Sequence, residues 1–170
     1  MIVTPWFSFA APPRCGTTWF TWLLQREGIE VQGGKNGSDK HHSGHEDGLP
    51  SITIRRNPAD WLLSYYLLNP NRVGVPEIDL FNTLRHSTAS LSEFVVRYIL
   101  EHPGKIETMF RLFRSTHTVD MCGMCTTFES LLPKLGMKLD INPMYYKVVN
   151  ATHTRGSLTN YERWAIEAAA

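Results

Sequence analysis

The sequence lacks any long apolar run. None of its hydrophobic stretches approaches the ~18 residues that a membrane-spanning helix requires. Its first residues also lack the basic segment, apolar stretch and small-residue cleavage site of a secretory signal. We therefore expect a soluble protein of the cytoplasm with no membrane partner.

The chain also has little net charge. It contains 17 Lys and Arg against 16 Asp and Glu, which gives a formal net charge of +1. Domains that bind nucleic acid through general phosphate attraction usually carry a marked basic excess. We expect no nucleic-acid partner, and any recognition of an anion must depend on a few local residues.

Cysteine is scarce, and its count is odd. The three cysteines form no disulfide framework, which fits a reducing compartment. Cys122 and Cys125 make a C-x-x-C pair, which has two interpretations. The favoured one is that both are small, largely apolar residues of the interior. The other is metal or redox chemistry, although a zinc site needs a second ligand pair and only His117 is near.

The residues that are present indicate one folded domain covering residues 1–170. Hydrophobic residues make up 42% of the chain and aromatic residues 11%, which is enough for a real core. Short β-rich runs alternate with helical patterns, which predicts an α/β protein with three layers, α/β/α, around a central parallel sheet. The strands are expected at residues 2–9, 29–31, 51–56 and 116–122. The helices are expected after N-caps at Thr17 or Thr18, Asn57, Ser90, Thr126 and Thr159, with another over 106–113.

The segment "PPRCGTTWFTWLL" (12–24) predicts a strand that turns into a helix around an anion. Such a turn aims unpaired backbone N–H groups and the positive end of the helix dipole at one point. Gly16 permits a close approach of the backbone, Thr17 and Thr18 add hydroxyl groups, and Arg14 adds a positive charge. A simple proline-bounded turn with a threonine cap is the alternative.

This loop lacks the first glycine and the lysine of the nucleoside triphosphate loop, G-x-x-x-x-G-K-[ST]. The strand at 51–56 ends in Arg55 and Arg56, where a Mg²⁺-dependent enzyme would offer a carboxylate. Ser64 lies two helical turns after Asn57, on the same side of its helix as the N-cap. The pattern favours a ligand with two anionic groups and no required metal.

These residues resemble a known family. "PPRCGTTW" (12–19) is similar to the 5′-phosphosulfate loop of sulfotransferases, usually P-K-S-G-T-T-W. "RNPADWLLSYY" (56–66) resembles their 3′-phosphate segment, R-N-P-x-D-x-x-x-S-Y-Y. The resemblance implies the P-loop-like sulfotransferase fold and the cosubstrate 3′-phosphoadenosine 5′-phosphosulfate (PAPS), whose product is adenosine 3′,5′-bisphosphate (PAP).

The resemblance also implies roles for individual residues. The expected PAPS contacts are Arg14, Cys15, Gly16, Thr17 and Thr18 at the 5′-phosphosulfate, Trp19 near the adenine, and Arg56 and Ser64 at the 3′-phosphate. The family carries K-x-H shortly before the second motif, and "KHH" (40–42) stands there. Lys40 would steady the transferring group together with Arg14, and His42 would be the general base, with His45 and His41 as alternatives.

The chain departs from the family at three places. Arg14 replaces a lysine and Cys15 replaces a serine. The C-terminal G-x-x-G-x-W-K segment is absent, and Arg155 and Gly156 are its partial substitutes. An ATP-dependent kinase and a catalytically degenerate nucleotide-binding protein therefore remain alternatives.

The sequence identifies neither the acceptor of the sulfuryl group nor the oligomeric state. A hydroxyl or amine of a small molecule, a glycan or a peptide would serve. Residues 69–90 are the expected acceptor wall. Tyr65, Tyr66 and Phe81 would be apolar contacts there, although core packing is the favoured interpretation for these three.

Overall fold

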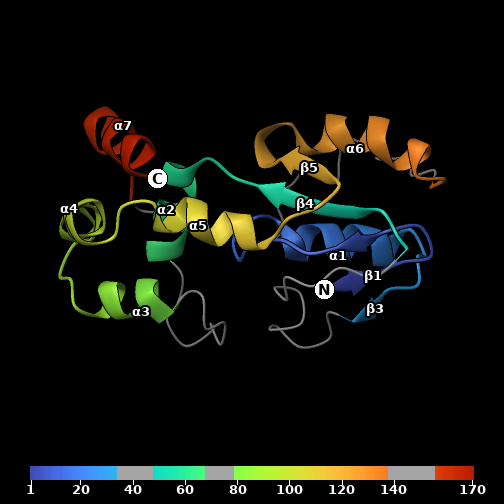
Figure 1. Cartoon of the computed structure of the whole chain (residues 1–170), viewed down its shortest axis with the longest axis horizontal. Helices are drawn as coiled ribbons and strands as arrows, with labels where there is room; N and C mark the ends of the chain where they lie inside the picture. Colours follow the sequence, from blue (N-terminus) through green and yellow to red (C-terminus); the bar gives the residue numbers. More distant parts are fainter. Residues whose placement is uncertain (34–47, 68–78, 138–155) are drawn as a thin grey trace. The chain divides into compact units, whose positions relative to one another are not determined.

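The computed structural model describes residues 1–33, 48–67, 79–137 and 156–170. It divides into two compact units (Figure 1). The first unit consists of residues 1–56 and 112–151, and the second of residues 57–111 and 152–170. In the described part of the chain, no helix is both long enough and apolar enough to cross a membrane.

The first unit contains a five-stranded mixed sheet in the order β3-β1-β2-β4-β5. Its strands are β1 (Ile2–Val3), β2 (Ser8–Phe9), β3 (Gln32–Gly33), β4 (Ser51–Arg55) and β5 (His117–Asp120). β2, β4 and β5 run parallel, whereas β1 is antiparallel to both β2 and β3. The α/β class is confirmed, and the expected parallel sheet is found only in part, because β1 makes the sheet mixed.

The antiparallel pair arises because residues 2–9 form a hairpin and not the single strand that the sequence predicts. Thr4 makes the turn: its Oγ1 accepts hydrogen bonds from the N–H groups of Trp6, at 3.3 Å, and Phe7, at 3.1 Å. The Thr4 hydroxyl also donates to the Phe7 carbonyl at 2.9 Å. Pro5 has no N–H to offer a neighbouring strand, which favours a turn at this point.

Aromatic contacts hold the helices of the first unit on the sheet. These helices are α1 (Thr17–Arg26), the short 3₁₀ helix η4 (Met121–Gly123) and α6 (Met124–Lys134). The Phe20 ring of α1 lies 4.6 Å from that of Phe9 in β2 and 4.4 Å from that of Phe128 in α6. The Phe20 ring therefore ties α1 both to the sheet and to α6.

The ends of these helices agree only in part with the sequence. Gly28, at φ 72°, follows α1 and ends it as predicted. Helix α6 begins at Met124 with Gly123 as its N-cap, so the predicted cap at Thr126 is wrong. The helical segment begins before Thr126 because Asp120 is the N-cap of η4. Its side chain accepts a hydrogen bond from the Cys122 N–H at 2.8 Å.

The second unit is helical and has its own aromatic core. Its helices are α2 (Pro58–Tyr66), α3 (Asp79–His86), α4 (Leu91–Glu101), α5 (Lys105–Leu112, whose last residue belongs to the first unit) and α7 (Asn160–Ala169). The Trp61 ring lies 4.9 Å from that of Phe81 and 5.2 Å from that of Tyr65. Phe81 is 1% exposed and Tyr65 2%, which confirms core packing for these two residues.

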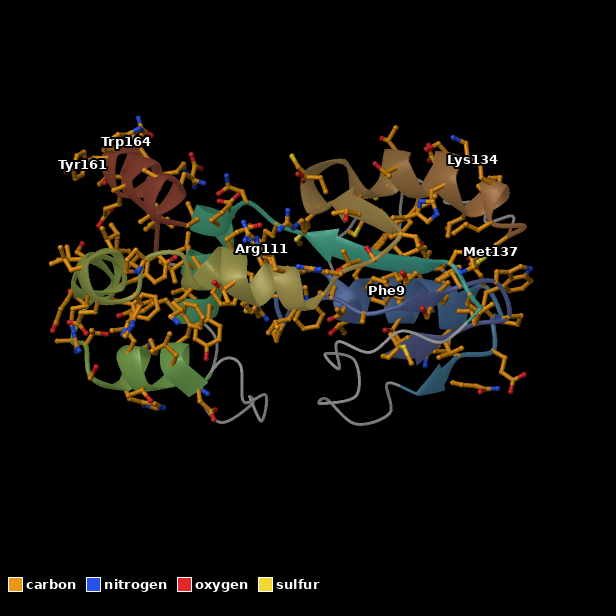
Figure 2. The ribbon with its side chains drawn as sticks, viewed as in Figure 1. Phe9, Arg111, Lys134, Met137, Tyr161 and Trp164 are labelled. Carbon is orange, nitrogen blue, oxygen red and sulfur yellow. The ribbon has the colours of Figure 1, made fainter. Side chains whose placement is uncertain are left out.

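Polar contacts fix the helix ends of the second unit. Asn57 caps α2 as predicted, and Thr159 and Glu162 form the predicted reciprocal capping box of α7. The Arg163 guanidinium then binds the Asp60 carboxylate at 2.6 Å, which ties α7 to α2. Side chains of α7, including Tyr161 and Trp164, project outward (Figure 2).

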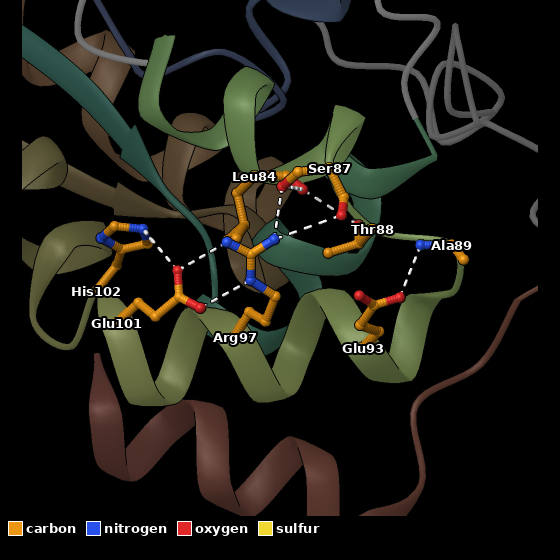
Figure 3. Close-up of polar contacts among 8 residues, drawn as sticks. All are labelled: Leu84, Ser87, Thr88, Ala89, Glu93, Arg97, Glu101 and His102. Carbon is orange, nitrogen blue, oxygen red and sulfur yellow. Dashed lines mark hydrogen bonds and ion pairs between the residues drawn. The ribbon is translucent and has the colours of Figure 1, made fainter.

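A second polar network joins α4 to the turn after α3 (Figure 3). Arg97 binds both carboxylate oxygens of Glu101, at 2.7 and 2.9 Å. The same guanidinium donates to the Ser87 hydroxyl at 2.7 Å. Ser90 caps α4 as predicted, while Glu93 accepts a hydrogen bond from the Ala89 N–H at 2.8 Å.

A candidate anion-binding loop before α1

The candidate site lies where the parallel strands of the first unit end. β2 leads directly into residues 10–16 and then into α1, and β4 runs parallel beside β2. The chain continues from α1 to β3, on one side of β2, and later returns to β4 on the other side. In α/β proteins, ligands bind outside the carboxyl ends of strands at such a reversal of strand order.

The backbone of this loop has two residues in the left-handed region. Arg14 has φ 68° and Gly16 has φ 77°, and the Cys15 N–H between them donates to the Pro12 carbonyl at 3.3 Å. Gly16 is the N-cap of α1, and no side chain caps the helix, so the predicted cap at Thr17 or Thr18 is wrong. The first N–H groups of a helix have no partner within it, and here no capping side chain competes for them.

Two methionines lie against the glycine of the loop. A Cβ built on Gly16 would meet the Met124 Sδ at 3.5 Å and the Met121 Cε at 3.9 Å. The start of α6 therefore packs close to the start of α1. A Cβ at Gly16 would be in ordinary van der Waals contact with both methionines, so it is the positive φ of 77° that favours glycine here.

Two arginines meet at the loop. The Arg56 Nη1 donates to the Arg14 carbonyl at 3.1 Å, and both residues are half-buried. Burial lowers the pKa of Arg14 below its ordinary value, and the positive charge of Arg56 lowers it further. Because both guanidinium groups stay charged at neutral pH, a bound anion would relieve their repulsion.

The remaining predicted loop residues differ in exposure. Thr18 is exposed in the first turn of α1, whereas Thr17 is 4% and Trp19 3% exposed. Cys15 is fully buried, and burial raises the pKa of its thiol to about 12. The side chains best presented at the surface of this loop are therefore those of Arg14 and Thr18.

Two of the other predicted site residues belong to the second unit. Ser64 lies in α2 of the second unit and is 6% exposed. Gly156 also belongs to the second unit, where a Cβ built on it would meet Leu67 at 3.6 Å. The predictions at Lys40, His41, His42, His45 and Arg155 fall outside the described residues.

Asp120 is a candidate functional residue that the sequence reasoning missed. It is the last residue of β5, is exposed, and lies in register with Arg55 at the end of β4. The carboxyl end of β5 therefore offers a carboxylate beside the basic end of β4. The signal was present in the sequence as an acidic residue within the predicted strand at 116–122.

The fold and this loop define an α/β protein with a candidate anion site at the start of a helix. No protein-family model matches the chain, and neither the curated proteins nor the solved structures contain a match. A function of this chain is therefore inferred from its geometry and its sequence motifs.

Proposed function

We propose that the protein transfers a sulfuryl group from PAPS to a hydroxyl or amine of an acceptor. The observation that carries the proposal is the contact of Arg56 with the Arg14 carbonyl at 3.1 Å. It joins the first residue of one sulfotransferase-like motif to the loop of the other. The two guanidinium groups and the first turn of α1 together suit a ligand with more than one anionic group.

The proposed chemistry is an in-line displacement at sulfur. The acceptor oxygen or nitrogen attacks the sulfur, the bond between the sulfur and the bridging oxygen breaks, and PAP leaves. The proton of the acceptor passes to His42, the base that the sequence motif suggests. Arg14 and Lys40 would stabilise the charge that develops on the departing phosphate, and no metal is required.

A Mg²⁺-dependent kinase is the second candidate function, because Asp120 ends a strand at the same edge of the sheet. Phosphoryl-transfer enzymes of this general type hold Mg²⁺ partly through such an acidic residue. Two features weigh against it. Asp120 Oδ1 already accepts the Cys122 N–H at 2.8 Å, and Arg55 stands in register beside it.

Calorimetric titration separates these functions. The protein is titrated with PAP, and with ADP and ATP in the presence and absence of Mg²⁺. We expect PAP to bind without metal and Arg56→Ala to weaken this binding by about 10- to 100-fold, the effect of losing hydrogen bonds to a charged group. Arg114→Ala is the matched control, because Arg114 is an exposed arginine at the opposite end of β5.

Asp120→Asn tests the second candidate directly. Asparagine keeps a side-chain oxygen for the Cys122 N–H, so the turn is preserved while the negative charge is lost. Under the sulfotransferase proposal, PAP binding is unchanged in this variant. Mg²⁺-dependent ATP binding that disappears in Asp120→Asn would establish the kinase, and no binding of any nucleotide would overturn both enzyme proposals.

A further inference from the structure

The C-x-x-C pair lies at the start of α6, beside the candidate anion loop. Cys122 is in η4 and exposed, and Cys125 is in the first turn of α6 and half-buried. The pair spans a 3₁₀ turn and the first turn of α6, and residues three apart have Cα atoms about 5 to 6 Å from each other in α-helical and 3₁₀ geometry. This separation is within the range that a disulfide spans.

The surroundings of the pair favour thiol chemistry over a metal. Among the residues that the structure describes, no group of three or more His, Cys, Asp or Glu side chains is arranged to hold a metal ion. A dithiol needs no further ligand. Cys122 is exposed, so it is the thiol that an external disulfide would meet first.

The residues within and beside the pair contact the anion loop. Met124 stands between the two cysteines, and its Sδ would lie 3.5 Å from a Cβ on Gly16. Met121, just before the pair, has its Cε 3.9 Å from the same position. Met124 is only 9% exposed, so a change in the backbone at 122–125 would be transmitted to Gly16 by direct packing.

We propose that Cys122 and Cys125 form a reversible disulfide, and that this disulfide alters anion binding at residues 12–18 through Met124. The part that concerns the anion rests on the proposed function. The oxidant is a small-molecule disulfide. The Cys122 thiolate attacks one of its sulfurs and releases one thiol, and then the Cys125 thiolate attacks the mixed disulfide and releases the second. The oxidant is reduced to two thiols, and the two cysteines are oxidised.

The first part of the test is chemical. The folded protein is equilibrated with reduced and oxidised glutathione, and its free thiols are alkylated and located by peptide mass mapping. We expect loss of two hydrogen atoms, a Cys122–Cys125 cross-link, and a buried Cys15 that alkylates only after unfolding. Absence of the cross-link under conditions in which glutathione is mainly oxidised would overturn the proposal.

The second part measures the coupling. Hydrogen exchange of residues 14–19 is compared in the oxidised and reduced protein, beside PAP affinity. We expect altered exchange and an affinity change of about fivefold or more, the lower end of typical coupling between sites. A cross-link that leaves both exchange and affinity unchanged would overturn the coupling.

Variants identify the route. In Cys122→Ser/Cys125→Ser, neither readout responds to glutathione. Met124→Ala should form the cross-link but lose the response of the loop, whereas Met137→Ala, which truncates a buried methionine of the same unit, should keep it. If Met124→Ala does not fold, Met124→Leu is used. On oxidation, its change in hydrogen exchange at residues 14–19 should differ in size from that of the wild type. If the loop responds but reduced protein binds no PAP, the proposed function fails and the redox inference stands.

Discussion

At the scale of single residues, the anion loop depends on a backbone that only some residues adopt. Arg14, at φ 68°, is the one described residue other than glycine with positive φ. Such a conformation is unfavourable for a residue with a Cβ, and Arg14 adopts it at the end of a strand. The hydrogen bond from Arg56 to the Arg14 carbonyl holds this backbone and positions the Arg56 guanidinium.

Gly16 gives a prediction at this scale. Gly16→Ala should lower the free energy of unfolding by about 1 to 2 kcal/mol, because the left-handed conformation is strained by a Cβ. The new Cβ would lie in ordinary van der Waals contact with the Met124 Sδ at 3.5 Å, so the strain falls on the backbone at the start of α1. We therefore expect weaker PAP binding as well, measured by calorimetry beside urea denaturation.

Gly28→Ala is the matched control for this prediction. Gly28 has a similar φ of 72° and follows the same helix, but a Cβ there would meet no atom within 4 Å. The Gly28→Ala variant should lose about as much stability as Gly16→Ala and keep the PAP affinity of the wild type. Equal effects of both variants on PAP affinity would show that Gly16 has no special place in the ligand site.

At the scale of elements, the sequence predicts what its local chemistry determines. The capping box of α7, the Asn57 cap of α2 and the glycine after α1 were all predicted, because each depends on residues within one turn of the helix end. The strand at residues 2–9 was predicted wrongly. Its apolar residues fit a strand, but Thr4 and Pro5 form a turn within it.

The site was harder to predict than the elements. The strand-to-helix loop at 12–18 follows from the glycine and the motif, and β2 and α1 flank it as expected. The positions of Asp120, Met121 and Met124 depend on which strands are neighbours, and strand order is a long-range property. No local pattern could reveal it.

Two of the threonines predicted as caps, Thr159 and Thr126, give a prediction at this scale. Thr159→Ala should lower the free energy of unfolding by about 1 kcal/mol, because the Glu162 N–H loses its partner, the Thr159 Oγ1 at 3.2 Å. Thr126→Ala is the control. Thr126 is exposed within α6 and caps nothing, so we expect a change of at most about 0.5 kcal/mol. Urea denaturation at pH 7 measures both.

The effect of Thr159→Ala should also depend on pH. Hydrogen bonds from the backbone N–H and then the side chain of Thr159 lower the pKa of Glu162 below its ordinary value. A carboxyl group with a lowered pKa stabilises the fold above its unfolded pKa of about 4.3, and this contribution is lost as the pH falls through the lowered value. The difference between wild type and Thr159→Ala should therefore shrink below about pH 4. A difference that stays constant to pH 2 would contradict the role of the ionised Glu162.

At the scale of the whole molecule, the chain has two aromatic cores. Phe20 joins the sheet to α6 in the first unit, and Phe81 lies against Trp61 and Tyr98 in the second. Contacts divide the chain into two compact units, each with one of these cores. A single domain over residues 1–170, expected from the length, stays a prediction that depends on whether the two cores unfold together.

Truncating each core tests this cooperativity. Phe81→Ala and Phe20→Ala each remove a fully buried ring and should destabilise by about 3 to 5 kcal/mol. If the units open separately, Phe81→Ala speeds amide exchange in α2, α4 and α7 and leaves α1 and β4 protected, while Phe20→Ala does the reverse. Hydrogen exchange followed by mass spectrometry in low urea measures this. Equal acceleration of exchange in both units by either variant would establish one cooperative domain. In that case, the anion loop would share the stability of the second core.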